Sequence, residues 1–349
     1  MAEQDLQPGD VPLEVCMRNG RLLCFAFVLS AGIGIASADP LSELSSFSIF
    51  DKVDLAQLAK SDAKTAHGPP MSNPRFLSVQ SVYVMPGSPT QHLDAMRNWN
   101  PTEHHEPKVY LHGDLPGSPS EAAFAKLKSA PDNGLVRALA NATAKMANEL
   151  QLSREEAAKW KGGNGALSGA GGDFWIGVLA GRARAFSSSG TATQPPYNHA
   201  GPAVRPGDEL NGLLREQGKI RKQFAGLLES TGVGRGAGSL KPDLYWELLN
   251  ADDVAVATLG ASYSRNSGGN VQAADTFYYA SGGYYVTLTL HQVWPVDVNG
   301  KPHTLIWRGD MVSSASLADL HGVEKLGSES AMMKDIAKSI ALFRRESGH

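Results

Sequence analysis

The residues best suited to chemistry in this chain are histidines and carboxylates gathered between positions 92 and 114. The cluster comprises His92, Glu103, His104, His105, Glu106, His112 and Asp114. Imidazole and carboxylate groups ligate zinc and other transition metals, and a histidine beside an orienting carboxylate can perform acid–base catalysis. The cluster therefore raises the hypothesis of a metal-dependent enzyme.

The metal hypothesis names three ligands, His104, His105 and His112, and has a plainer alternative. Neighbouring side chains on an extended segment point apart, so His104 and His105 would rarely serve one metal. Neither an HExxH motif nor a histidine pair at i and i+4 is present. The alternative is a solvated polar loop, and the sequence assigns no catalytic residue.

Aromatic residues near the C-terminus form a second candidate group. The stretch "TFYYASGGYY", residues 276–285, places tyrosines on both sides of a Ser-Gly-Gly turn. Ligand pockets are apolar with a few polar groups, so Tyr284, Tyr285 and Trp307 are candidate ligand-binding residues. Cross-strand packing is the ordinary alternative for aromatic side chains on strands.

Two glycine-containing segments imitate nucleotide-binding loops. In "STGVGRGAGS", Gly232, Gly234 and Ala237 match the G-x-G-x-x-G/A spacing. That motif must follow a strand and open a helix, whereas this segment follows a predicted helix. The segment "GLLREQGKI" has one residue too many for a phosphate-binding P-loop. Neither segment predicts a nucleotide, and no cofactor is indicated.

The N-terminal segment predicts export. Residues 22–36 form an uncharged apolar run preceded by Arg18 and Arg21 and followed by Ala36-Ser37-Ala38. A bilayer-spanning helix needs about 20 apolar residues, and this run has the length of a signal peptide. We predict that residues 1–38 are a signal peptide, with Met17 as the possible true start. A retained anchor is the alternative.

Cleavage before Asp39 would leave a periplasmic or extracellular chain of 311 residues without cysteine. Cys16 and Cys24 both precede the cut, so the mature chain would have neither a disulfide nor a thiol nucleophile. It would carry 30 basic and 31 acidic residues. This balance argues against nucleic-acid binding and, with the leader removed, no permanent membrane anchor is expected.

Hydrophobic periodicity predicts a single α+β domain over residues 39–349, with a mainly antiparallel sheet covered by helices. Strands are predicted at 75–85, 174–186, 253–264, 284–294 and 303–312. Asn299-Gly300 predicts a tight hairpin between the last two. Helices are predicted at 134–150, 242–250 and 328–345, the last a long C-terminal helix. Residues 118–163 predict a helical insertion.

The order of these elements resembles a known fold. Residues 79–99, "VQSVYVMPGSPTQHLDAMRNW", predict a strand, a turn and a short helix, and residues 284–345 predict two antiparallel strands and a closing helix. This order resembles the START-like helix-grip fold, which encloses a cavity between a curved sheet and its last helix. The resemblance implies non-catalytic binding of an apolar small molecule or lipid. The phrases "WNP", "KVYLHGDLP" and "ASGGYYVTLTLHQVWPV" resemble uncharacterised exported bacterial proteins, which implies no activity.

A second resemblance implies a different partner. The segments "ADDVAVATLGA" and "YYVTLTLHQVWPVDVNGKPHTLIWRGD", followed by a terminal helix, are similar to envelope proteins of the curli-secretion and penicillin-binding-protein-activator type. Those proteins use this arrangement as a protein-interaction module. The alternative function is therefore an envelope interaction module, with an exposed aromatic patch at residues 278–285 and an envelope protein as partner.

Overall fold

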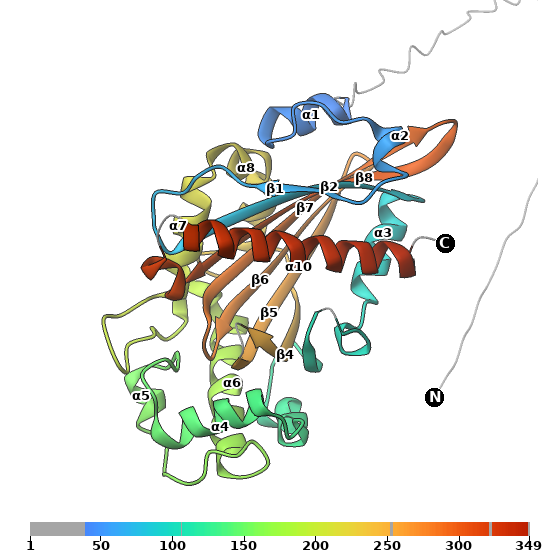
Figure 1. Cartoon of the computed structure of the whole chain (residues 1–349). Helices are drawn as coiled ribbons and strands as arrows, with labels where there is room; N and C mark the ends of the chain where they lie inside the picture. The colour runs from blue at the N-terminus through green and yellow to red at the C-terminus, as the bar shows by residue number, and fades with distance from the viewer. Residues whose placement is uncertain (1–38, 106, 252–253, 321–322, 348–349) are drawn as a thin grey trace, which may run out of the picture. The chain divides into compact units, whose positions relative to one another are not determined.

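The chain folds as an α+β protein, as predicted from the sequence. The computed structural model describes residues 39–105, 107–251, 254–320 and 323–347, which belong to one compact unit (Figure 1). The predicted signal peptide, with Met17 and both cysteines, lies outside the described residues. Among the described residues, no helix has the length and apolar character needed to cross a bilayer.

One antiparallel sheet of eight strands forms the centre of the structure, in the order β1-β2-β8-β7-β6-β5-β4-β3. The strands are β1 (Lys64–His67), β2 (Phe76–Pro86), β3 (Val109–Leu115), β4 (Asp243–Ala251), β5 (Val254–Ser267), β6 (Asn270–Ala280), β7 (Tyr284–Val298) and β8 (Lys301–Ser314). Strand β2 pairs with β8, so the N-terminal and C-terminal parts of the described chain lie side by side.

The predicted hairpin at Asn299-Gly300 is confirmed. These two residues join β7 to β8 with φ angles of 54° and 76°. Positive φ at both central residues is the geometry of the tight turn that matches the twist of paired strands. The hairpin sets the register in which His291 faces Arg308 and Thr289 faces Asp310.

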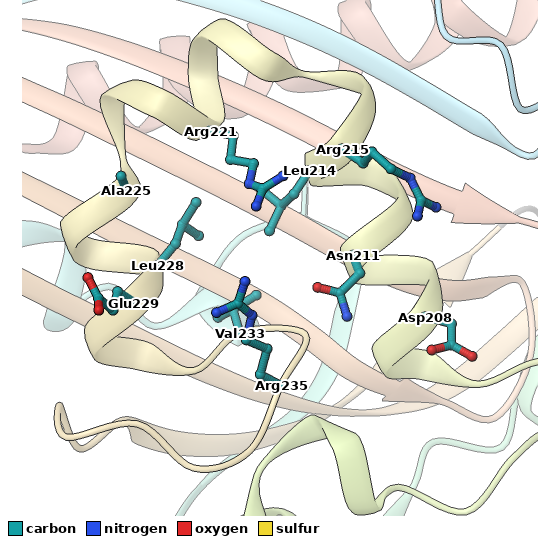
Figure 2. Close-up of a pocket in the computed structure, with 10 residues that line it drawn as sticks. All are labelled: Asp208, Asn211, Leu214, Arg215, Arg221, Ala225, Leu228, Glu229, Val233 and Arg235. Carbon is teal, nitrogen blue, oxygen red and sulfur yellow. The ribbon is translucent and has the colours of Figure 1, made fainter.

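Helices cover both faces of the sheet. They are α1 (Pro40–Phe47), α2 (Leu55–Leu58), α3 (Pro89–Arg97), α4 (Gly134–Lys145), α5 (Arg154–Ala157), α6 (Ala170–Ser189), α7 (Pro206–Glu216), α8 (Gly218–Gln223), α9 (Ala225–Thr231) and α10 (Val323–Ser347). We call the face packed against α1 and α6–α9 the helical face; Figure 2 shows α7–α9 lying across its strands. The opposite face, under α3 and α10, is the pocket face.

Alternation along each strand divides its side chains between the two faces. On β2, Val82 and Val84 pack in the core of the helical face, whereas Val79 and Tyr83 pack in the core beneath α10. Both sets are almost fully buried. Nearly every residue of β2 is therefore buried, since each face of the strand meets a covering layer.

The prediction of a strand at residues 174–186 is wrong, because these residues belong to α6. An alternation of Phe174, Ile176, Val178 and Ala180 suggested a period of two. Trp175 and Leu179, which lie between members of this set, are also fully buried. A helix that is enclosed on nearly all sides loses its amphipathic pattern. A short apolar run is then ambiguous between helix and strand.

The prediction of a helix at residues 242–250 is also wrong, because this segment forms β4. Its leucines and tryptophan recur at alternate positions, with Leu244, Trp246 and Leu248 all buried on the helical face. Pairing with both β3 and β5 supplies partners for its backbone groups. Neighbouring strands therefore override the local helical tendency.

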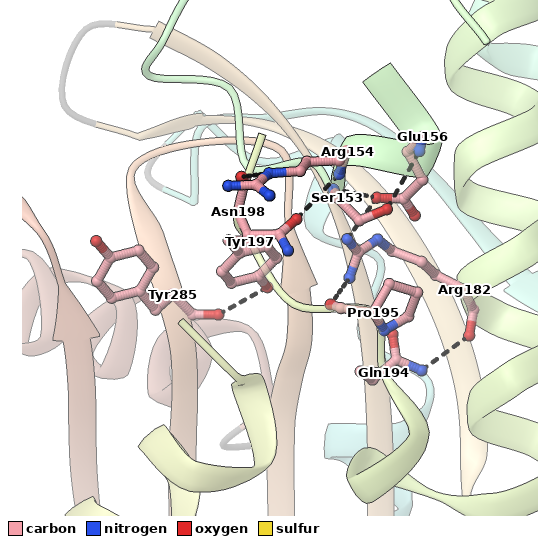
Figure 3. Close-up of polar contacts among 9 residues, drawn as sticks. All are labelled: Ser153, Arg154, Glu156, Arg182, Gln194, Pro195, Tyr197, Asn198 and Tyr285. Atoms are coloured by element: carbon pink, nitrogen blue, oxygen red, sulfur yellow. Dashed lines mark hydrogen bonds and ion pairs between the residues drawn. The ribbon is translucent and has the colours of Figure 1, made fainter. Parts of the chain in front are cut away.

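A buried arginine connects the helices inserted between β3 and β4 to the sheet (Figure 3). Arg182 on α6 is fully buried and donates to the Glu156 carboxylate at 2.6 Å and to the Pro195 carbonyl at 2.9 Å. Its guanidinium lies 4.2 Å from the ring centroid of Tyr279 on β6. Glu156 also accepts from the backbone N–H of Ser153, which completes a capping box at the start of α5.

Replacement of Arg182 by methionine should destabilise the protein by about 3–5 kcal/mol, because Glu156 would remain as an uncompensated buried charge. Urea unfolding followed by circular dichroism measures the change. Adding Glu156→Gln should recover part of the loss, since glutamine is neutral and can still accept from Ser153. Additive effects of the two substitutions would contradict the coupling.

Candidate functional site

A pocket of about 280 Å³ lies between the pocket face of the sheet and the helices α3 and α10. Five strands, β2 and β5–β8, contribute its floor, and α3, α10 and the segment after α3 contribute its roof. The lining residues are Tyr83, Leu93, Met96, Arg97, Trp99, Pro107, Ser262, Ser264, Ala273, Ala274, Asp275, Thr289, His291, Arg308, Ser339, Ile340 and Phe343. The pocket therefore occupies the space between the sheet and the last helix.

The roof of the pocket is mostly apolar. Leu93 and Met96 project from α3, which begins with a capping box formed by Ser88 and Gln91. Ile340 and Phe343 project from α10. Trp99 follows α3, and its ring lies 5.2 Å from the ring of Phe343 in an edge-on arrangement, which ties the end of α3 to α10.

The floor is polar because three neighbouring strands place polar residues in register. Asp275 on β6 faces Thr289 on β7, and His291 on β7 faces Arg308 on β8. Antiparallel neighbours in register share one face of a sheet. Residues separated by more than 30 positions in the sequence thus meet beneath an apolar roof.

Asp275 is the carboxylate of the floor. Its Oδ1 accepts a hydrogen bond of 2.6 Å from the hydroxyl of Tyr245 on β4. Burial is the main cause that raises the pKa of Asp275 from 3.8 to about 6. Gly260 leaves room for the Tyr245 ring, since a Cβ there would lie 2.1 Å from a ring carbon. The site therefore holds a carboxyl group that titrates near neutral pH.

Arg308 is neutralised within the floor. Its Nε and Nη2 donate to the Asp310 carboxylate at 2.8 and 2.7 Å, and Thr289 donates to the same group at 2.9 Å. This two-pronged contact is the strong form of an arginine–carboxylate pair. Arg308 therefore contributes polarity to the pocket without an unpaired charge.

His291 is a neutral histidine with spare hydrogen-bonding capacity. Its side chain is almost fully buried, and Nδ1 has no hydrogen-bond partner among the residues that the structure describes. Burial, followed by Arg308 and His92, holds the pKa of His291 well below 6.5. Buried polar atoms are normally paired, so this atom is available to a molecule in the pocket.

The three aromatic residues predicted to bind a ligand lie outside the pocket lining. Trp307 is fully buried on the helical face, where its ring contacts Phe47 at a centroid distance of 4.9 Å. Tyr285 stacks on Tyr197 at 5.9 Å and also lies on that face. Tyr284, at the start of β7, packs beside the core under α10.

The three predicted metal ligands lie apart. His104 stacks on Trp99 at 4.1 Å, with Nε2 3.3 Å from Glu346, while His105 is exposed. His112 on β3 has Nδ1 3.0 Å from Glu247, and this hydrogen bond is the main cause that raises the pKa of His112. Within the described residues, which omit Glu106, no three histidine, cysteine, aspartate or glutamate side chains are placed to hold a metal.

Sequence reasoning did not select Asp275, His291 and Arg308. The signal available was a set of polar residues at alternate positions in otherwise apolar strands, such as Thr287, Thr289 and His291 in β7. Alternation alone is also typical of a strand with a solvated face. Only the presence of α3 and α10 above this face turns those residues into a pocket floor.

Replacement of Asp275 by asparagine should stabilise the protein at pH 8 by about 3 kcal/mol and change little at pH 4. The raised pKa means that the folded protein holds the proton more tightly than the unfolded chain, so wild-type stability falls as pH rises from 4 to 6. Asparagine lacks this charge and still accepts from Tyr245. Urea unfolding at both pH values measures the difference.

The exposed Asp94→Asn on α3 is the matched control and should show no such pH dependence. A stability difference between Asp275→Asn and wild type that is the same at pH 4 and pH 8 would contradict the assignment of a charged, desolvated Asp275.

Comparison with known proteins does not assign the chain to a family. No family model matches the chain, and no curated protein is significantly similar to it. The fold and the pocket therefore stand on the geometry described above.

Proposed function

We propose that the protein binds a small, largely apolar molecule carrying at least one hydrogen-bonding group in the pocket between the sheet and α10. The observation that supports this most strongly is the pairing of an apolar roof with a floor that offers Asp275 and the unpartnered His291. Ligand sites commonly combine apolar walls with a few polar groups that fix orientation.

The location of the pocket supports the resemblance to helix-grip proteins. Those proteins hold their ligand between a curved sheet and the last helix, and the pocket lies between strands β2 and β5–β8 on one side and helices α3 and α10 on the other. The helices between β3 and β4 would then be an insertion into such a fold. We further propose export, so that binding would occur in the periplasm or outside the cell.

The size of the pocket narrows the ligand class. A volume of about 280 Å³ lies near the lower end of the range of about 300–1,000 Å³ that is common for ligand pockets. A compact ring system or short-chain molecule fits this space better than a two-chain lipid. His291 is neutral, Arg308 is paired with Asp310, and the Nε of Arg97 lies 3.9 Å from the Asp243 carboxylate. The polar group of the ligand should therefore be uncharged or cationic rather than anionic.

The alternative of an interaction module depends on an exposed aromatic patch at residues 278–285. Tyr278 and Tyr279 are fully buried against α6 and its arginine. Tyr284 and Tyr285 are partly buried. These positions give the patch no support, and we therefore favour ligand binding.

The Ser339→Trp substitution should abolish binding of 1-N-phenylnaphthylamine, a neutral aromatic probe whose fluorescence rises in apolar surroundings. Ser339 on α10 lines the pocket, so an indole there would fill it. We expect saturable fluorescence enhancement with the wild-type protein and at least a tenfold weaker response with the variant, an order of magnitude typical of lost apolar contacts.

The Ser330→Trp substitution is the matched control, because Ser330 lies on the same helix but is exposed. It should bind the probe as the wild type does. Thermal unfolding of both variants establishes that α10 remains docked. Equal probe binding by a folded Ser339→Trp protein, or a wild type that does not bind the probe, would overturn the proposal.

A further inference from the structure

A second and larger pocket lies in the helical layer, away from the proposed ligand site. It has a volume of about 670 Å³, is open to solvent on one side and is bordered by α7, α8, α9 and the glycine-rich loop that follows α9. Buried Leu214, Leu228 and Val233 form its apolar base. These helices pack on the helical face of the sheet, so the two pockets lie on opposite faces.

Three arginines line this pocket without any charged partner among the described residues. Arg215, Arg221 and Arg235 are exposed and have no side-chain hydrogen bond or ion pair to any residue that the structure describes, whereas the more buried Arg182 and Arg308 are paired. Figure 2 shows Arg221 and Arg235 pointing toward the middle of the pocket, while Arg215 points to one side. Two guanidinium groups that line the same hollow repel each other, and an anion bound between them would offset this repulsion.

The two carboxylates in the pocket lining do not neutralise Arg221 and Arg235. Asp208 and Glu229 form no ion pair with the arginines, and Figure 2 shows them at opposite margins of the pocket. Three arginines and two carboxylates leave a net charge of +1 in the lining. The positive charge is concentrated at the centre, where Arg221 and Arg235 converge.

The loop that carries Arg235 is held in a defined conformation. Gly232 and Gly234 have φ angles of 67° and 76°, which other residues adopt rarely. The Asn211 amide donates to the Gly234 carbonyl, and the backbone N–H of Ala192 donates to the Arg235 carbonyl at 2.8 Å. The segment that resembled a dinucleotide loop thus follows a helix and instead places Arg235 opposite Arg221.

We propose that this pocket binds a small organic anion, with a phosphate or carboxylate group between Arg221 and Arg235 and an apolar body on Leu214, Leu228 and Val233. Guanidinium groups recognise both oxyanions through paired hydrogen bonds. The apolar base has no role in binding an inorganic ion alone, and the volume exceeds what such an ion occupies. This inference does not depend on the function proposed for the other pocket.

Isothermal titration calorimetry of the protein with phenyl phosphate tests the proposal. Two control probes each lack one part of this ligand: inorganic phosphate lacks the apolar body, and benzyl alcohol lacks the anionic group. We expect saturable binding of phenyl phosphate and weaker binding of both partial probes. Arg221→Met and Arg235→Met should each weaken phenyl phosphate binding roughly tenfold or more, as expected for loss of a charge-assisted contact. Benzoate should bind in the same way if a carboxylate suffices.

Two further variants distinguish binding at this pocket from non-specific attraction of the anion to positive charge on the protein surface. Arg184→Met removes an exposed arginine on α6 outside the pocket and should leave binding unchanged. Glu229→Gln removes a lining carboxylate and should strengthen binding. Absence of phenyl phosphate binding, equal loss in Arg184→Met, or binding that survives both pocket variants would overturn the proposal, as would benzyl alcohol binding equally well.

Discussion

The structure depends on a mismatch between the width of the sheet and the helices available to cover its second face. Eight strands spaced about 4.8 Å apart span about 34 Å, whereas one helix with its side chains is about 10 Å wide. Helix α10 packs on β1 and β2, and α3 packs on β6 and β7. The space between them cannot be filled by either helix alone, and the pocket forms there.

The helical face has no such shortage of covering elements. Helices α1, α6, α7, α8 and α9 pack against it, and Trp175, Trp246 and Trp307 are fully buried within its core. Dense packing of this kind maximises apolar burial and dispersion contacts. The two faces therefore have different roles. The helical face stabilises the fold through dense packing, whereas the pocket face is less densely packed and contains the pocket.

The polar floor of the pocket is unfavourable for stability. Burial of Asp275 disfavours its charged form, and His291 carries a buried nitrogen without a hydrogen-bond partner. Residues that reduce stability in this way are concentrated at functional sites, because there the same atoms interact with a ligand. This reasoning connects the energetics of the floor to the binding proposed for it.

The helices inserted between β3 and β4 give the protein its second pocket. Arg182 connects α5, α6 and the sheet through one buried guanidinium, so the inserted segment packs as part of the core. A β-bulge in β6 contributes to this junction, since it turns both Tyr278 and Tyr279 toward α6. Helices α7–α9 then have a fixed base on which Arg221 and Arg235 can converge.

Local signals in the sequence were sufficient for the α+β class, the strand predicted at 75–85 (β2, Phe76–Pro86), the Asn299-Gly300 hairpin and the C-terminal helix. Each of these depends on residues a few positions apart, where turn geometry or periodicity acts directly. The sequence alone did not reveal that α6 is a helix or β4 a strand, because their states depend on burial among distant elements. The sequence alone also did not predict that Asp275, His291 and Arg308 lie close together. Their proximity depends on strand register and on the covering of one sheet face by α3 and α10, which are properties of the tertiary structure.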